Sequence, residues 1–169
     1  MKKMVFVLSA FILAMFCRLE VKAAYDVTAP KLNSVTLDKE TVIKPGVLNI
    51  TLDITEEETG VTRIDVSYSQ LSTNRFTTIP IETSNIFTEK YTVSIPISSS
   101  FKSGDDYYVA GVRLWDGQGN ESYYEVRSEE ANKLCLWRIN KDGSYSENEF
   151  CYVNCKFAIK EEFDVDFQY

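Results

Sequence analysis

The chain contains no histidine among its 169 residues. Histidine is the commonest general base near neutral pH and a frequent ligand of zinc. Its absence excludes the Ser-His-Asp and Cys-His arrangements of nucleophilic catalysis and most zinc sites. The sequence also lacks a phosphate-cradling glycine loop and a Cys-x-x-Cys motif, so it predicts neither nucleotide nor thiol redox chemistry. We therefore expect a protein that is not an enzyme and that requires no cofactor.

Long apolar runs are absent except for one near the N-terminus. Lys2 and Lys3 precede a largely apolar run of 13 residues, Met4 to Phe16, and Val21-Lys22-Ala23 follows as a cleavage site. This order of charge, apolar run and small residue is typical of an export signal over residues 1–23, with a short Lys-rich start that fits a bacterium. The run is too short to cross a bilayer as a helix, so we expect no transmembrane segment after cleavage. The product is predicted to be secreted or held at the cell surface.

Positive charge is also in deficit. The formal net charge is −7, and cleavage after residue 23 removes four positive residues and one negative residue, which leaves −10. The positive residues removed are Lys2, Lys3, Arg18 and Lys22, and the negative one is Glu20. An acidic chain without a basic cluster is not expected to bind nucleic acid or an anionic membrane surface.

Helical periodicity is missing after the signal, and short runs of alternating apolar residues take its place. Leu48, Ile50, Leu52 and Ile54 form the clearest such run. Seven strands are predicted, in the ranges Lys31–Asp38, Val47–Thr55, Ile64–Tyr68, Phe76–Glu82 and Tyr91–Ile97, and in a hairpin over Asp106–Val126. Pro80 places the fourth of these at a sheet edge. Seven short strands with one apolar face each indicate an all-β, two-sheet antiparallel sandwich over residues 24–127.

Four motifs resemble the bacterial immunoglobulin-like modules of secreted and cell-surface proteins. They are the lead-in Asp26-Val-Thr-Ala-Pro30, the turn Glu58-Thr-Gly60-Val61, Tyr108 on the core face, and Leu114-Trp-Asp116-Gly-Gln-Gly119-Asn120. The resemblance covers about residues 26–127 and implies a seven-stranded sandwich that serves adhesion, ligand binding or spacing at the cell exterior. The second motif departs from the family pattern, because Glu and Thr stand where Asp and Ser are usual.

Carboxylates occur in three loops that an immunoglobulin-like sandwich brings to one pole. They belong to Asp26, Glu56, Glu58 and Asp116, and the side-chain carbonyl of Asn120 lies in the same turn as Asp116. Calcium takes six to eight oxygen ligands in irregular geometry, so these five residues form a candidate calcium site. The alternative is that Asp116 and Asn120 shape a turn by bonding to the backbone while the glutamates are solvated.

Residues 128–169 are predicted as a C-terminal extension, either a β-hairpin or a truncated second module. Its strands would be Leu134–Ile139 and Phe150–Ile159 around the turn Asn140-Lys-Asp-Gly143. Three cysteines lie there, and in an oxidising exterior Cys135 can bridge to Cys151 if the two strands pair. The alternative is that the thiols stay free and pack as small hydrophobic groups.

Aromatic residues on the outer face of the predicted hairpin form a second candidate site. Tyr107 and Trp115 are expected to face outward, as is either Tyr123 or Tyr124, of which Tyr124 is assigned to the site. There they could stack on sugar rings or contact a protein partner. The alternative is that the C-terminal hairpin covers them. A third possibility, a small exported hydrolase that uses Asp116 and a pole glutamate, stays open because any acidic chain offers paired carboxylates.

Overall fold

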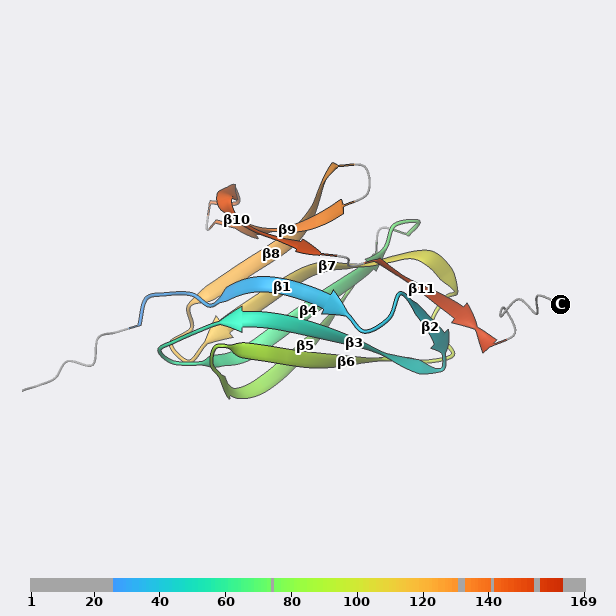
Figure 1. Cartoon of the computed structure of the whole chain (residues 1–169), viewed down its shortest axis with the longest axis horizontal. Coiled ribbons are helices and arrows are strands. Elements are labelled where there is room, and N and C mark those ends of the chain that lie inside the picture. The colour runs from blue at the N-terminus through green and yellow to red at the C-terminus, as the bar shows by residue number, and fades with distance from the viewer. Residues whose placement is uncertain (1–25, 74, 131–132, 141, 154–155, 163–169) are drawn as a thin grey trace, which may run out of the picture.

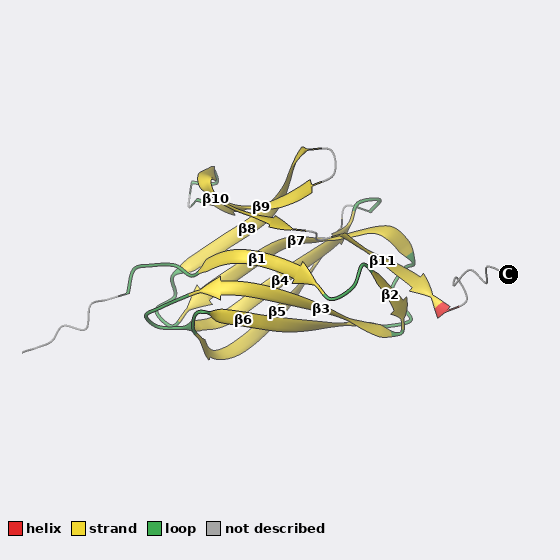
Figure 2. Cartoon of the chain, viewed as in Figure 1, coloured by secondary structure: helices red, strands yellow, loops and turns green. Residues whose placement is uncertain are grey.

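The computed structural model describes residues 26–73, 75–130, 133–140, 142–153 and 156–162. The predicted export signal lies outside these ranges. Strands make up most of the described chain, and loops lie at the ends of the strands (Figure 2). None of the described segments forms a helix with the length and apolarity that crossing a bilayer requires.

The described residues form eleven strands. They are β1 (Lys31–Leu37), β2 (Thr41–Lys44), β3 (Gly46–Thr55), β4 (Val61–Gln70), β5 (Arg75–Ile86), β6 (Glu89–Ile97), β7 (Gly104–Asp116), β8 (Glu121–Glu130), β9 (Lys133–Ile139), β10 (Tyr145–Val153) and β11 (Lys156–Glu161). The prediction of an all-β chain is confirmed. The predicted number of strands, seven in the sandwich and two in the C-terminal hairpin, is lower than the eleven that the described residues form. The short β2 was not predicted, because Thr41–Lys44 is too brief to show an alternating pattern.

The strands are arranged in two facing layers (Figure 1). In one layer β3 pairs antiparallel with both β1 and β6. In the other layer β4 pairs antiparallel with β5 and β7, and the second edge of β7 is shared between β8 and β11. The strands β9 and β10 join the layers at one side, since β9 pairs with β8 and β10 pairs in parallel with β1. Hydrogen-bonded ladders therefore link all eleven described strands.

The core lies between the layers and consists of the alternating apolar residues that the sequence predicted. Leu48, Ile50, Leu52 and Ile54 of β3 are all 0% exposed. Opposite them lie buried residues of β4 and β7, among them Ile64, Val66, Val112 and Leu114. Burial of a Val, Leu or Ile side chain stabilises a fold by about 1.5–3 kcal/mol relative to exposure, so this double row supplies much of the stability.

A β-bulge interrupts the alternation in β7. Ser67 of β4 lies opposite Gly111, but the next residue, Tyr68, lies opposite Val109, so Ala110 is an extra residue. An extra residue changes which side chains face the core on its two sides. For this reason Tyr107 is on the buried side, whereas strict alternation from Leu114 placed it outside.

The described strands after residue 127 belong to the same sheet as the rest. The boundary predicted at residue 127 falls inside β8. The segment Phe150–Ile159, predicted as one strand, belongs to two: β10 ends at Val153 and β11 begins at Lys156. The strand β11 leaves the hairpin, pairs antiparallel with β7 and pairs parallel with β2.

Candidate functional site

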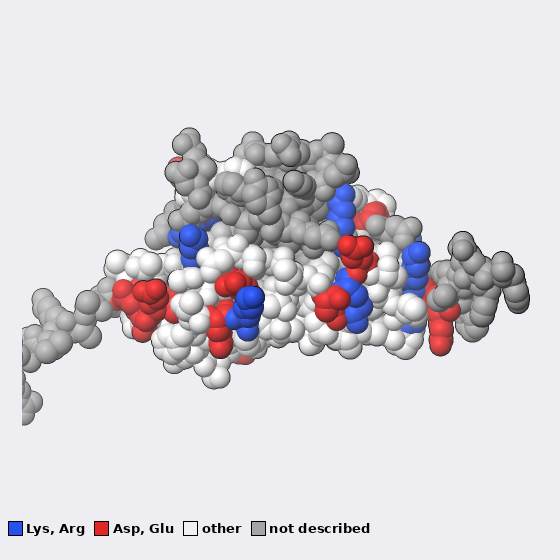
Figure 3. All heavy atoms as spheres, viewed as in Figure 1, with Lys and Arg blue, Asp and Glu red and all other residues white. Residues whose placement is uncertain are grey.

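Three buried carboxylates meet at the pole where the described chain begins. Asp26 belongs to the lead-in before β1, Glu56 follows β3, and Asp116 ends β7. Each offers an oxygen that lies within 4.8 Å of the oxygens of the other two. The residues are only 2%, 4% and 2% exposed, respectively. Further acidic side chains surround this pole on the surface (Figure 3).

The turn between β7 and β8 is organised by Asp116. Its Oδ1 accepts hydrogen bonds from the N–H groups of Gln118 and Asn120, both at 2.8 Å. The side-chain nitrogen of Asn120 donates to Asp116 Oδ2 at 2.7 Å and to the backbone oxygen of Asp26 at 3.0 Å. The expected turn-shaping role of Asp116 is therefore visible in the structure, and Asn120 in addition ties the turn to the lead-in.

The loop between β3 and β4 packs directly on this turn. The N–H of Gly117 donates to the backbone oxygen of Gly60 at 3.0 Å. A side chain at position 117 would lie 3.1 Å from the backbone oxygen of Thr59, so the approach needs glycine there. Gly60 has a φ of +75°, a conformation that glycine adopts without strain. Both glycines thus bring Glu56 within reach of Asp116.

Hydrogen bonds hold the other two carboxylates but leave acceptor capacity. Glu56 Oε1 accepts from the N–H groups of Glu58 and Thr59 at 2.9 and 3.1 Å. Asp26 accepts from the N–H of Thr28 and from the hydroxyl of Thr59, the latter at 2.7 Å. An ionised carboxylate can accept about four hydrogen bonds, so lone pairs remain on all three groups. The sequence analysis missed Thr59, because a loop threonine carries no spacing signal.

The charge of this cluster is unbalanced within the described residues. Their ion pairs join no Lys or Arg to Asp26, Glu56 or Asp116. The hydrogen bonds from the Thr28 N–H and the Thr59 hydroxyl lower the pKa of Asp26, so it is ionised at neutral pH. The neighbouring charge of Asp26, followed by burial and by the charge of Glu56, raises the pKa of Glu58. Buried charges are normally paired with an opposite charge or bound to a metal.

An oxygen-only donor set of this kind suits a hard cation. The separation of up to 4.8 Å between the oxygens is the span of ligands that share one calcium ion at about 2.4 Å. Of the five predicted ligands, Asp26, Glu56 and Asp116 are brought together. Glu58 is exposed beside them, and Asn120 turns its side-chain nitrogen, not its carbonyl, toward the acidic groups. The alternative expectation of solvated glutamates is wrong for Glu56.

Two of the three aromatic residues proposed as an outward-facing site are buried, which is a correction. Tyr107 is 5% exposed, donates its hydroxyl hydrogen to the backbone oxygen of Lys102, and stacks on Phe157 of β11. Tyr124 is 1% exposed, and its hydroxyl accepts a hydrogen bond from the N–H of Leu32 at 3.1 Å. The bulge in β7 explains Tyr107. In the Tyr123–Tyr124 pair, Tyr123 is the residue that lies on the outer face.

The third aromatic residue, Trp115, is partly exposed on the outer face of the second layer. The guanidinium groups of Arg63 and Arg113 lie 4.9 and 5.6 Å from its ring centroid. Such cation–π contacts are worth about 0.5–1 kcal/mol at exposed sites. These two arginines lie where an external ligand would have to contact the indole ring.

The cysteine pairing lies outside the described side chains. The backbone register places Tyr152 opposite Cys135 and Leu136 opposite Cys151. A bridge between Cys135 and Cys151 stays a prediction, and in this register the two residues are one position away from direct opposition.

Comparison of the chain with protein-family models, with curated proteins and with solved structures finds no match.

Proposed function

We propose that this chain is an exported, non-catalytic immunoglobulin-like module that binds a partner or acts as a spacer at the cell exterior, with its pole held by calcium. The observation that carries the proposal is the cluster of three buried carboxylates, which has no basic partner among the described residues. Calcium sites of extracellular modules have dissociation constants of about 10⁻⁴–10⁻³ M, which suits a protein with an export signal.

The strand pairing supports the immunoglobulin-like part of the proposal. The layer of β1, β3 and β6 faces the layer of β5, β4, β7 and β8, and the chain crosses between the layers from β3 to β4, from β5 to β6 and from β6 to β7, as it does in such sandwiches. In this interpretation β8 and β11 are two halves of the last strand, since both pair with the same edge of β7. The hairpin of β9 and β10 is then an excursion inserted between the halves.

The role of calcium would be mechanical. Asp26, Glu56 and Asp116 come from three separate segments, and an ion bound between them would cross-link the lead-in, the β3–β4 loop and the β7–β8 turn. An ion bound in this way would hold the lead-in, the loop and the turn in a defined arrangement relative to one another. Rigid presentation of loops is the usual way in which such sandwiches serve binding.

Calorimetric titration of the chelator-treated protein with calcium tests the metal site. We expect one site with a dissociation constant of about 0.1–1 mM, and weaker binding of magnesium, which gives up its water shell reluctantly. Asp116→Asn should weaken calcium binding at least tenfold, and Asp53→Asn, a carboxylate of β3 outside the cluster, should not. A titration of the wild-type protein that shows no heat of calcium binding would refute the calcium site.

Fractionation of the cells that produce the protein tests the location. Most of the protein should be in the medium or open to added protease on intact cells. Retention in the cytoplasm after export of a control protein would refute the exterior role.

A further inference from the structure

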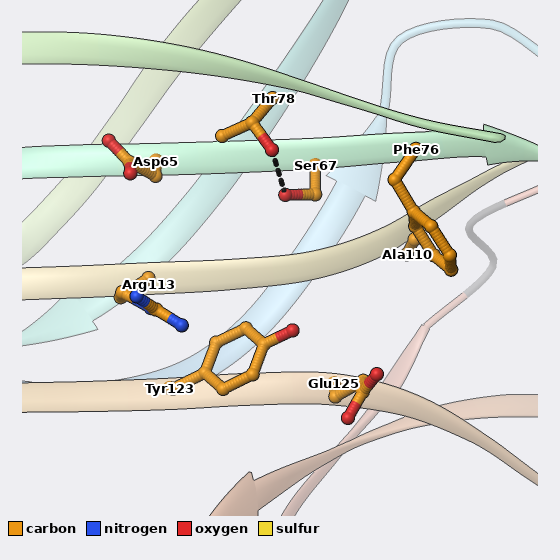
Figure 4. A pocket seen from close by; sticks show the side chains of 8 residues that line it. All are labelled: Asp65, Ser67, Phe76, Thr78, Ala110, Arg113, Tyr123 and Glu125. Atoms are coloured by element: carbon orange, nitrogen blue, oxygen red, sulfur yellow. Dashed lines mark hydrogen bonds between the residues drawn. The ribbon is translucent and has the colours of Figure 1, made fainter.

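The outer surface of the second layer contains an open hollow of about 280 Å³ (Figure 4). It lies over β5, β4, β7 and β8, on the far side of these strands from the core. The residues that line it are Asp65, Ser67, Phe76, Thr78, Ala110, Arg113, Tyr123 and Glu125. None of them belongs to the acidic pole.

One wall of the hollow depends on a glycine in the middle of the sheet. Gly111 of β7 pairs with Ser67 on one side and with Glu125 on the other. A side chain there would begin 3.2 Å from Cε2 of Tyr123 and 3.4 Å from its hydroxyl oxygen. The Tyr123 side chain therefore lies over Gly111, and the absence of a side chain at Gly111 lets it take this place beside the hollow.

Several polar groups around the hollow are held in place by neighbours. Arg63 donates to both carboxylate oxygens of Asp65, at 3.0 and 3.2 Å, and Arg113 forms an ion pair with Glu121, with 3.2 Å between Nε and Oε1. Ser67 and Thr78 share a hydrogen bond of 2.8 Å between their hydroxyl groups. Fixed side chains lose little entropy when a ligand binds, so this wall is prepared for hydrogen bonding.

Two groups on the opposite wall have unused capacity. The hydroxyl of Tyr123 points into the hollow (Figure 4), and neither it nor the carboxylate of Glu125 makes a hydrogen bond with a described residue. Burial is the first cause that raises the pKa of Tyr123, so the hydroxyl stays protonated and can donate. Arg113 lies 4.4 Å from the centroid of the Tyr123 ring and fixes its orientation.

Aromatic surface completes the hollow. The ring of Phe76, from β5, is 56% exposed and borders the hollow together with Tyr123 of β8 (Figure 4). An exposed phenylalanine on a sheet face offers an apolar plane to a ligand. The hollow thus combines two aromatic rings with hydrogen-bond donors and acceptors within a volume near the lower end of the range for small-molecule sites, about 300–1,000 Å³.

We propose that this hollow binds a neutral pyranose ring of a saccharide. A sugar ring has apolar C–H faces that pack on aromatic rings, and hydroxyl groups that donate to carboxylates and accept from guanidinium or phenol groups. Asp65 and Glu125 disfavour an anionic ligand, and Arg113 disfavours a cationic one. The inference names a ligand class for the binding role proposed above. It rests on that proposed function only for the location of the ligand, outside the cell. The site differs from the predicted aromatic set, of which it includes none.

Chemical-shift mapping by NMR on the exported chain, residues 24–169, tests the proposal. The probes are methyl glucoside, methyl galactoside, methyl mannoside and methyl N-acetylglucosaminide, each titrated to tens of millimolar. At least one should bind with a dissociation constant on the order of 1 mM, with the largest shifts at residues of the hollow. Tyr123→Ala should weaken binding at least tenfold, because it removes both the ring and the open hydroxyl. Glu125→Gln, which keeps the shape of the side chain, should weaken it severalfold.

Matched controls separate the hollow from the rest of the surface. Phe87→Ala removes another exposed aromatic ring, and Glu89→Gln neutralises a glutamate of β6 in the other layer, so both should bind as the wild-type protein does. The proposal is overturned if none of the four sugars binds, if the shifts lie outside the hollow, or if arginine methyl ester binds there in place of the sugars. The experiment is run without calcium, so its failure leaves the metal site of the pole standing.

Discussion

Neutralising Glu56 should have opposite effects on stability in the absence and presence of calcium. Without the ion, the three carboxylates at the pole repel one another, and none has a basic partner among the described residues. Glu56→Gln removes one charge, while its side-chain oxygen still accepts from the N–H groups of Glu58 and Thr59. The variant should therefore melt at or above the wild-type temperature in chelator.

With calcium the order should reverse. For a dissociation constant of 10⁻⁴–10⁻³ M, 5 mM calcium adds RT ln(1 + [Ca]/Kd), or about 1–2 kcal/mol, to the free energy of unfolding. In a chain of this size that corresponds to a rise in Tm of roughly 3–8 °C. Glu56→Gln should lose most of this rise, because the site would keep only two carboxylates.

Differential scanning calorimetry in chelator and in 5 mM calcium measures both effects. Glu57→Gln is the matched control, since Glu57 is exposed and adjacent in the chain but outside the cluster, and it should keep the full wild-type rise. A wild-type Tm that calcium does not change, or an equal rise in Glu56→Gln, would contradict this account of the pole.

Three further predictions concern the fold. Tyr124→Phe leaves the N–H of Leu32 without its buried partner and should lower the free energy of unfolding by about 1–3 kcal/mol, as measured by urea denaturation, whereas Tyr91→Phe should change it little. Ile50→Ala should cost about 2–5 kcal/mol in the same assay, because Ile50 is 0% exposed, and Ile43→Ala, at a position 43% exposed, should cost far less. The hydrogen bonds from Gln70 and from the Ser72 N–H lower the pKa of Asp106 against the opposing effect of burial, so its stabilising contribution is present above about pH 4, the ordinary aspartate pKa, and is lost as the pH falls through the lowered value. Asp106→Asn should accordingly lower Tm at pH 7 and have little effect near pH 2; an equal loss at both pH values would contradict this reasoning.

The sequence predicted the strands with strict alternation and failed where alternation breaks. Leu48–Ile54 follows one period of two throughout, so its buried face could be read directly. In β7 the inserted Ala110 changes the phase, and the one local sign of this bulge is the neighbouring Gly111, because glycine inside a strand often marks a bulge. Tyr107 was misplaced for that reason alone.

Local patterns predicted the acidic pole better than the aromatic site. Asp26, Glu56 and Asp116 sit beside turn residues whose order along the chain implies a shared pole in a sandwich, and the structure brings all three together. The hollow on the second layer could not be predicted in this way. It depends on the register between four strands, which brings residues from 65 to 125 together on one face.

The edge of β7 shared by β8 and β11 sets an order of events for folding. β11 follows every other described strand in the chain, yet it fills the gap beside Tyr107 and gives β2 its ladder partner. A polypeptide that emerges N-terminus first therefore keeps part of this sheet unpaired until its final strand arrives. Unpaired strand edges attract other chains, so the period between emergence and closure is when this protein would be most open to aggregation and most in need of a holding chaperone.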